Sequence, residues 1–385
     1  MSLIVQKFGG SSVNTFEKRE MAISKITSAK DKGHDVVIVV SAMGRMGEPY
    51  ATDTLIKLLN DITLNPKNKL KDLIMSCGEI ISAAIMAQSL EDKGYPAEVM
   101  TGIQAGIKTD DNFSSAEILE INSDRIKRCL EKGKIVVVAG FQGYTHNLET
   151  TTLGRGGSDT SAIALGGALK ADIVEIYTDV SGIALADPRL ISDAPILEHI
   201  EFAPMYILSS AGAKIIHPRA VKTAMEYKMP FVVRSTFDNF PGTIVGFKGS
   251  AVKGLYGIAL TKNVYILKSK YEGLVRSMEN NIVNKLFFTQ VNGEYSLAIH
   301  GGFNLPKLNN SNLFVSDGCD IITLAWDSSR LDSDRIEEYL SNGNIAHQGY
   351  FPLEKGGAWA VPSELSSKCI RHLYDSLVRD QELAV

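Results

Sequence analysis

Cysteine, basic charge and long apolar runs are scarce in this chain of 385 residues. Its four cysteines form no CxxC pair, and its seven histidines are scattered without the spacing of metal ligands. The 40 basic residues are outnumbered by 44 acidic ones, and no basic block occurs. The composition therefore gives no support to a disulfide scaffold, a metal centre, or a protein that binds nucleic acid or membrane surfaces. We expect reduced thiols, no signal peptide and no membrane-spanning run, and hence a cytoplasmic protein.

Apolar, β-branched runs alternate with helical patterns over the first two thirds of the chain. Strands are predicted at residues 3–8, 36–40, 97–101, 135–139 and 173–178. Five consecutive apolar β-branched residues, as in 36–40, are typical of a parallel strand that is buried on both faces. The alternation predicts an α/β fold with a mostly parallel central sheet, helices on both faces, and a site along the carboxyl ends of the strands.

A glycine-rich segment, residues 153–161, follows the strand at 135–139 and precedes an alanine-rich helical run at 162–171. Glycines let the backbone approach a ligand closely, and the N–H groups at the start of a helix favour an anion. The segment also carries Arg155 and Asp159. These features indicate a binding loop, although a glycine turn with a capping Ser or Asp is the alternative interpretation of so short a motif.

The first strand ends in a second glycine turn. Lys7 faces the turn at 9–13, where its ammonium group could reach a phosphate held by backbone N–H groups. This is no Walker A loop, because the lysine precedes the glycines. A solvated lysine at a strand end is the alternative. Asn14 and Glu17 have capping-box spacing, which predicts a helix that runs to Asp31.

A long helical stretch is predicted at residues 71–93, and it contains Glu79 beside its apolar face. That carboxylate is either solvated at the flank of the helix or turned inward to bind a cation. Beyond a change of pattern near 241–252, the chain alternates short β and α segments, with a hairpin predicted at 285–300. We interpret this part as two small units without a catalytic constellation.

Five separated segments carry a resemblance to a known family. They are residues 6–13, 41–45, 152–159, 178–189 and 212–218. In this order and spacing they resemble the aspartate kinases of the amino acid kinase family, and in particular the monofunctional forms of Gram-positive bacteria. The similarity covers roughly residues 1–245.

The resemblance implies an amino acid kinase fold for a catalytic domain at residues 1–245. It implies transfer of the γ-phosphate of ATP, with Mg²⁺, to the side-chain carboxylate of L-aspartate, giving 4-phospho-L-aspartate for lysine, methionine and threonine synthesis. Residues 250–385 would then form a smaller α+β region, a diverged pair of ACT-like units for regulation and dimerisation. The expected partners are a second copy of the chain and an amino-acid effector, either lysine, threonine or diaminopimelate.

The resemblance also implies roles for individual residues. Nucleotide and phosphate contacts fall to Lys7, Gly9, Gly10, Ser11, Thr178, Asp179, Arg189 and Lys214. Contacts with L-aspartate fall to Ser41, Glu79, Arg155 and Ser158. Glu79 would take the substrate ammonium and Arg155 the α-carboxylate, for which a planar guanidinium is suited. The catalytic residues would be Lys7, Asp159 and Lys214, with Asp159 organising the lysines or Mg²⁺, and no residue is assigned as a metal ligand.

The sequence departs from the family pattern at three places. Ala184 stands where the family usually has a tyrosine, and residues 202–206 contain a proline near a helix start. The C-terminal part lacks the usual effector-loop segments. Two alternatives therefore stand beside aspartate kinase: a kinase of the same fold that acts on another carboxylate acceptor, and a catalytically weak regulatory paralogue.

Overall fold

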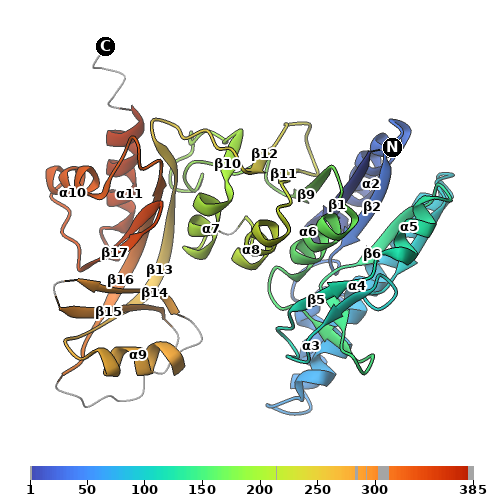
Figure 1. Cartoon of the computed structure of the whole chain (residues 1–385), viewed down its shortest axis with the longest axis horizontal. Helices are drawn as coiled ribbons and strands as arrows, with labels where there is room; N and C mark the ends of the chain where they lie inside the picture. Colours follow the sequence, from blue (N-terminus) through green and yellow to red (C-terminus); the bar gives the residue numbers. More distant parts are fainter. Residues whose placement is uncertain (1, 214, 282–284, 292, 302–311, 380–385) are drawn as a thin grey trace. The chain divides into compact units, whose positions relative to one another are not determined.

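The computed structural model describes residues 2–213, 215–281, 285–291, 293–301 and 312–379. The chain divides into two compact units (Figure 1). The first comprises residues 1–183 and 215–247, and the second comprises residues 184–214 and 248–385. The functional assignment of residues 1–245 as catalytic and 250–385 as regulatory stays a prediction.

A twisted, mainly parallel sheet forms the centre of the first unit. Those of its strands that belong to the first unit lie in the order β12 (Thr243–Gly246), β11 (Phe231–Ser235), β9 (Ile173–Thr178), β1 (Leu3–Phe8), β2 (Asp35–Val40), β6 (Ile135–Ala139) and β3 (Ala97–Met100). All neighbouring pairs in this series are parallel except β11 with β12. The predicted parallel sheet is therefore confirmed, and the ends of β1, β2 and β9 share one edge.

Helices cover both faces of this sheet, as predicted. On one face, α2 (Phe16–Asp31) and α4 (Asn68–Asp92) bury residues such as Ile26 and Met86 against the strands. On the other face, α6 (Gly157–Leu169) packs against β1, beside α8 (Pro218–Tyr227). The remaining elements of the unit are α1 (Gly10–Val13), α3 (Thr52–Asn60), α5 (Asp124–Leu130) and a small sheet in the order β5 (Ile118–Ile121), β4 (Ile107–Thr109), β7 (Gln142–Tyr144), β8 (Thr150–Thr152).

The second unit contains a sheet of antiparallel neighbours. Its strands lie in the order β14 (Lys285–Val291), β15 (Glu294–His300), β13 (Leu255–Ser269), β16 (Phe314–Trp326), β18 (Gly356–Pro362) and β17 (Gly349–Leu353). The helices are α7 (Phe202–Ser210), α9 (Glu272–Asn281), α10 (Ser333–Asn342) and α11 (Ser366–Tyr374), with β10 (His199–Glu201) before them and a π-helical turn, η1 (Asp375–Arg379), after them. The hairpin predicted at 285–300 is confirmed by the antiparallel pairing of β14 with β15, and Asn292 lies outside the described residues.

Two local expectations are wrong. The helix after the glycine-rich segment begins at Gly157, so residues 158–161 form its first turns rather than a loop. The residue that caps α2 is Thr15, whose hydroxyl accepts a hydrogen bond from the backbone N–H of Lys18 at 3.3 Å. Asn14 instead follows the short helix α1, because residues 10–13 are helical rather than a glycine turn.

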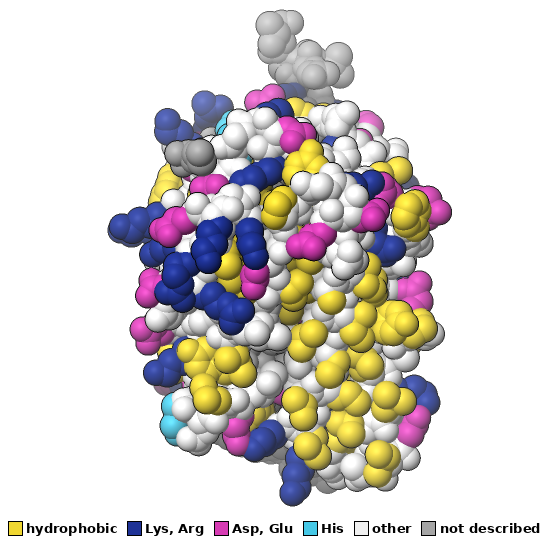
Figure 2. All heavy atoms as spheres, turned by 90° about the vertical axis from the view of Figure 1, so that its right-hand side faces the viewer, with side chains coloured by type: hydrophobic (Ala, Val, Ile, Leu, Met, Phe, Trp, Pro, Cys, Tyr) yellow, Lys and Arg dark blue, Asp and Glu magenta, His cyan; other side chains and the backbone are white. Residues whose placement is uncertain are grey.

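The α4 helix is apolar on much of its surface. By length and composition it could span a membrane, an exception to the expectation that no such segment exists. Yet its inner face is buried in the core of the first unit, which is the behaviour of a core helix. Leu70 and Leu73 on α4, and Leu58 on α3, remain exposed. Figure 2, which views the right-hand side of Figure 1, shows a broad band of hydrophobic side chains on that side.

A buried carboxylate, Asp72, joins α4 to the small sheet. Its Oδ2 accepts hydrogen bonds from the backbone N–H groups of Ser114 and Thr152, both at 2.8 Å. Its Oδ1 accepts from the hydroxyls of the same two residues, both at 2.9 Å. Asp72 is fully buried, and these four bonds replace the water that it loses on folding. The side chain therefore fixes the segment that leads into the glycine-rich residues.

Replacing this carboxylate should destabilise the protein. Asp72→Ala leaves buried donors without an acceptor, and we expect the free energy of unfolding to fall by about 2–4 kcal/mol. Asp92→Ala, at the exposed end of the same helix, is the control, with an expected change within about 0.5 kcal/mol. Denaturant titrations of both variants measure the difference, and equal stabilities would contradict the structural role of Asp72.

Candidate active site

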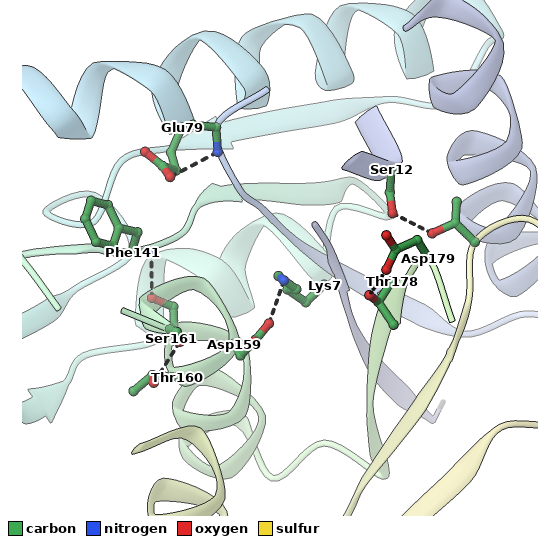
Figure 3. A network of polar contacts seen from close by, with 12 residues as sticks. Lys7, Ser12, Glu79, Phe141, Asp159, Thr160, Ser161, Thr178 and Asp179 are labelled. Carbon is green, nitrogen blue, oxygen red and sulfur yellow. Dashed lines mark hydrogen bonds and ion pairs between the residues drawn. The ribbon is translucent and has the colours of Figure 1, made fainter. Parts of the chain in front are cut away.

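The site is built around an ion pair between β1 and α6. Lys7 Nζ lies 2.6 Å from Asp159 Oδ1, and both side chains are almost buried, at 11% and 13% exposure (Figure 3). Lys7 is opposite Val39 and Ile176 in the parallel register. Its charge is therefore held in an apolar setting, where an ammonium group needs a partner.

The segment that links β1 to α1 contacts the ends of the two neighbouring strands, β2 and β9. The N–H of Gly9 donates to the carbonyl of Tyr177 at 3.3 Å, and the N–H of Ser41 donates to the carbonyl of Phe8 at 3.1 Å. A Cβ on Gly10 would lie 2.4 Å from the carbonyl oxygen of Ala42, so that only glycine fits. The backbone N–H groups at the start of α1, at Gly10 and Ser11, have no acceptor within that helix and are suited to an anion.

A second carboxylate, Glu79 of α4, lies near the segment that links β1 to α1. It is 2% exposed, and its Oε1 accepts a hydrogen bond from the N–H of Ala42 at 3.0 Å. Its Oε2 is buried and has no hydrogen-bond partner among the described residues. Burial raises the pKa of Glu79 to about 8, although the Ala42 N–H and the charge of Lys7 act in the opposite direction. Of the two readings of the sequence, the inward-facing carboxylate is thus the one that the structure shows.

Residues at the N-terminal end of α8 pack against the glycine-rich segment and support it. Gly156 has a φ of +70°, and a Cβ there would lie 2.2 Å from Cβ of His217. Arg219 donates hydrogen bonds to the backbone carbonyls of Leu153 and Ala116. Burial lowers the pKa of His217, whose ring accepts a bond from the N–H of Arg219 at 3.3 Å. Arg155 itself is exposed at the tip of this supported segment.

Polar residues also follow β9. The hydroxyl of Thr178 donates to Asp179 Oδ1 at 3.1 Å (Figure 3), and Arg45 Nη2 of the 41–47 loop lies 3.7 Å from Asp179 Oδ2. Arg45 and Asp179 are 79% and 52% exposed on their side chains. An ion pair so exposed contributes little to stability, and it leaves both charges accessible to a ligand.

Most of the residues expected at the site belong to the first unit. They lie at the sheet edge and on the adjoining helices and loops of that unit: Lys7, Gly9, Gly10, Ser11, Ser41, Glu79, Arg155, Ser158, Asp159, Thr178 and Asp179. Arg189 belongs to the second unit, where its guanidinium pairs with Asp187 at 2.6 Å. Lys214 lies outside the described residues. Sequence reasoning missed the supporting roles of Asp72 and Arg219, because both act on backbone far away in the chain.

The arrangement combines a buried cation, backbone N–H groups and a carboxylate with an unused oxygen. No group of three His, Cys, Asp or Glu side chains that could hold a metal occurs among the described residues. A cation and N–H groups suit an anion such as a phosphate, and Glu79 suits a cationic group. The geometry therefore favours a ligand pair of opposite charge at the edge of the sheet.

The chain is similar to known proteins over most of its first unit. Residues 2–235 match the amino acid kinase family. An aspartokinase of Geobacillus stearothermophilus is 46% identical over 245 residues, which cover 64% of this chain and 59% of that protein. Aspartokinase 1 of Bacillus subtilis is 42% identical over 306 residues, which cover 77% of this chain and 74% of that protein. The match thus spans less than two thirds of the length of the Geobacillus relative.

Solved structures show the same fold. E. coli aspartokinase III in complex with aspartate and ADP superimposes with a TM-score of 0.79 at 23% identity, covering 98% of this chain and all of that one. Aspartate kinase from Synechocystis is 30% identical, with a TM-score of 0.59, covering 98% of this chain and 69% of that one. The chain therefore belongs to the amino acid kinase family, whose members include the two aspartokinase relatives named above.

Proposed function

We propose that this protein phosphorylates the side-chain carboxylate of L-aspartate with ATP, giving 4-phospho-L-aspartate. The observation that carries the proposal is the placement of Lys7, paired with Asp159, near the inward-facing Glu79. The curated aspartokinase relatives support the choice of substrate. We propose further that this reaction serves the synthesis of lysine, methionine and threonine in the cytoplasm.

The chemistry that this reaction requires matches the residues of the site. A carboxylate is already a nucleophile, so no strong base is needed, and catalysis reduces to alignment of the reactants and neutralisation of phosphate charge. Lys7 and the N–H groups of Gly10 and Ser11 would bind the transferred phosphate. Asp159 would orient the ammonium group of Lys7 through their ion pair. The resemblance to the family assigns neutralisation of the phosphate to Lys214 as well.

The substrate would be held by residues of opposite charge. Glu79 would accept the ammonium group of L-aspartate, and Arg155 would bind its α-carboxylate, with Ser41 and Ser158 beside them. Thr178 and Asp179 would contact the nucleotide, together with Arg189. Mg²⁺ needs few protein ligands when it is bound to nucleotide phosphates, which fits a site without a cluster of metal-binding side chains among the described residues.

The second unit is proposed to serve regulation and dimerisation as a diverged pair of ACT-like units. Its sheet of antiparallel strands covered by helices is consistent with such domains. A structure of E. coli aspartokinase III contains lysine together with aspartate, which supports an amino-acid effector here, whether lysine, threonine or diaminopimelate. A homodimer formed through residues 250–385 is the corresponding assembly.

Trapping of the acyl phosphate by hydroxylamine tests the function. With ATP, Mg²⁺ and L-aspartate, the protein should form the hydroxamate, and omission of ATP should abolish the signal. A panel of other amino acids in place of L-aspartate tests the acceptor. A stronger signal from another acceptor would reassign the substrate while keeping the reaction, and no signal from any acceptor would make the chain a regulatory paralogue.

Removal of Arg155 should weaken substrate binding selectively. Arg155→Ala deletes a charge-assisted pair with the α-carboxylate, worth about 1.5–3 kcal/mol, so KM for L-aspartate should rise about 10- to 100-fold. KM for ATP should change less than about threefold. Arg128→Ala, an exposed arginine on α5, is the matched control. Initial-rate kinetics with each substrate varied decide the matter, and an equal rise for both substrates would argue against the assignment.

The raised pKa of Glu79 predicts a pH dependence of substrate binding. Only the ionised carboxylate pairs with the ammonium group, and with a pKa of about 8 most Glu79 is protonated at pH 6. KM for L-aspartate should therefore fall about tenfold per pH unit as the pH rises towards 8, and level off above it. Glu79→Gln, which cannot ionise, should have a high KM without this slope. A slope that persists in the variant would show that another group titrates.

A further inference from the structure

A hollow of about 340 Å³ lies on the sheet face opposite to Lys7, within the first unit. Its walls come from α2, from the strands β1, β9 and β11, and from residues 238–241 after β11. Side chains alternate along a strand, so Gln6 faces this hollow while its neighbour Lys7 faces α6. The volume suits a small metabolite.

The floor of the hollow is a network of polar side chains on the sheet. Glu175 is its centre: Oε2 accepts from Gln6 Nε2 at 2.9 Å and from the Tyr177 hydroxyl at 3.0 Å, and Oε1 pairs with Arg234 Nη1 at 3.1 Å. Burial raises the pKa of Tyr177, so its phenol remains a donor. Polar residues at the centre of a sheet cost free energy unless their hydrogen bonds are made.

Two polar atoms of this network have no hydrogen-bond partner within the part of the chain that the structure describes. Gln6 is 1% exposed, and its Oε1 has no hydrogen-bond partner among the described residues. The same holds for Nε of Arg234. Both residues line the hollow. One acceptor and one donor are thus left over at the floor, where the remaining groups of the network are already paired.

Positive charge lies at the rim. Lys25 and Lys32 come from α2, and His34 follows that helix. Lys25 Nζ donates to the carbonyl of Asp238 and to Asn239 Oδ1, both at 2.7 Å, which leaves one of its three N–H groups for a ligand. Lys32 is exposed. Asp238 also lines the hollow, and its carboxylate accepts hydrogen bonds from the Ser181 hydroxyl and the N–H of Phe240. The hollow therefore offers lysine N–H groups at its mouth and an acceptor with a carboxylate at its floor.

We propose that this hollow is a second ligand site, for a small zwitterion of the amino-acid type. Its ammonium group binds Gln6 Oε1 beside Glu175, and its carboxylate binds between Lys25 and Lys32. An anion alone would leave the Gln6 acceptor unpaired, and a cation alone would be repelled by the two lysines at the rim. The ligand contacts Gln6 and Tyr177, which directly precede Lys7 and Thr178 in β1 and β9. The inference does not depend on the proposed kinase reaction.

Calorimetric titration of the full chain with individual L-amino acids other than aspartate tests the proposal, because binding is measured without turnover. At least one should bind saturably, with a Kd that rises at least tenfold in Gln6→Met and in the double variant Lys25→Ala with Lys32→Ala. Lys30→Ala, on the same helix but outside the hollow, is the matched control and should keep the affinity within about twofold. Thermal unfolding checks that each variant is folded. If Gln6→Met does not fold, the lysine double variant alone tests the proposal.

Three results would overturn the proposal. Absence of saturable binding by any amino acid is the first. Binding that survives both the Gln6 and the lysine substitutions would place the ligand elsewhere, for example in the second unit. Inorganic phosphate that binds as tightly as any amino acid, and loses affinity only in the lysine variant, would show a simple anion site. A failure of the hydroxamate assay would leave each of these outcomes unaffected.

Discussion

The burial of Lys7 within the central sheet is the constraint that organises the first unit. An ammonium group in this apolar setting costs several kcal/mol unless a charge meets it. Asp159 meets that need from the first turn of α6, so this helix has to begin beside the end of β1. The approach requires Gly156, because its positive φ and its contact with His217 exclude a side chain. The glycine-rich segment is thus a consequence of the ion pair as much as a binding loop.

The strands of the first unit could be predicted from the sequence because their residues are apolar and β-branched, as in β2 and β6. The start of α6 could not, since serine and threonine serve equally well in a loop and in a first helical turn. Tertiary contacts decide that boundary: Asp159 pairs with Lys7, and Ser161 Oγ accepts a bond from the N–H of Phe141. Neither contact can be predicted from the spacing of neighbouring residues in the sequence.

The supporting groups of the site could not be predicted for the same reason. Asp72 bonds to residues 42 and 80 positions away, and Gln6 bonds to Glu175 across 169 positions. No periodicity relates such pairs. Charged residues on an apolar helix are usually solvated, so the burial of Asp72 and Glu79 follows only from the packing of α4 against the sheet and the loops.

The two carboxylates Asp72 and Glu79 differ in how completely their hydrogen bonds are made. They lie two helical turns apart on one buried face of α4, so that sequence pattern and burial treat them alike. Each carboxylate oxygen of Asp72 accepts two hydrogen bonds from Ser114 and Thr152, so the hydrogen bonding of this group is satisfied without a ligand. Glu79 has one backbone donor, its other oxygen is buried with no donor among the described residues, and burial raises its pKa. A bound cationic group would supply the missing partner, and this difference is the reason that we propose Glu79, and not Asp72, as a ligand-binding carboxylate.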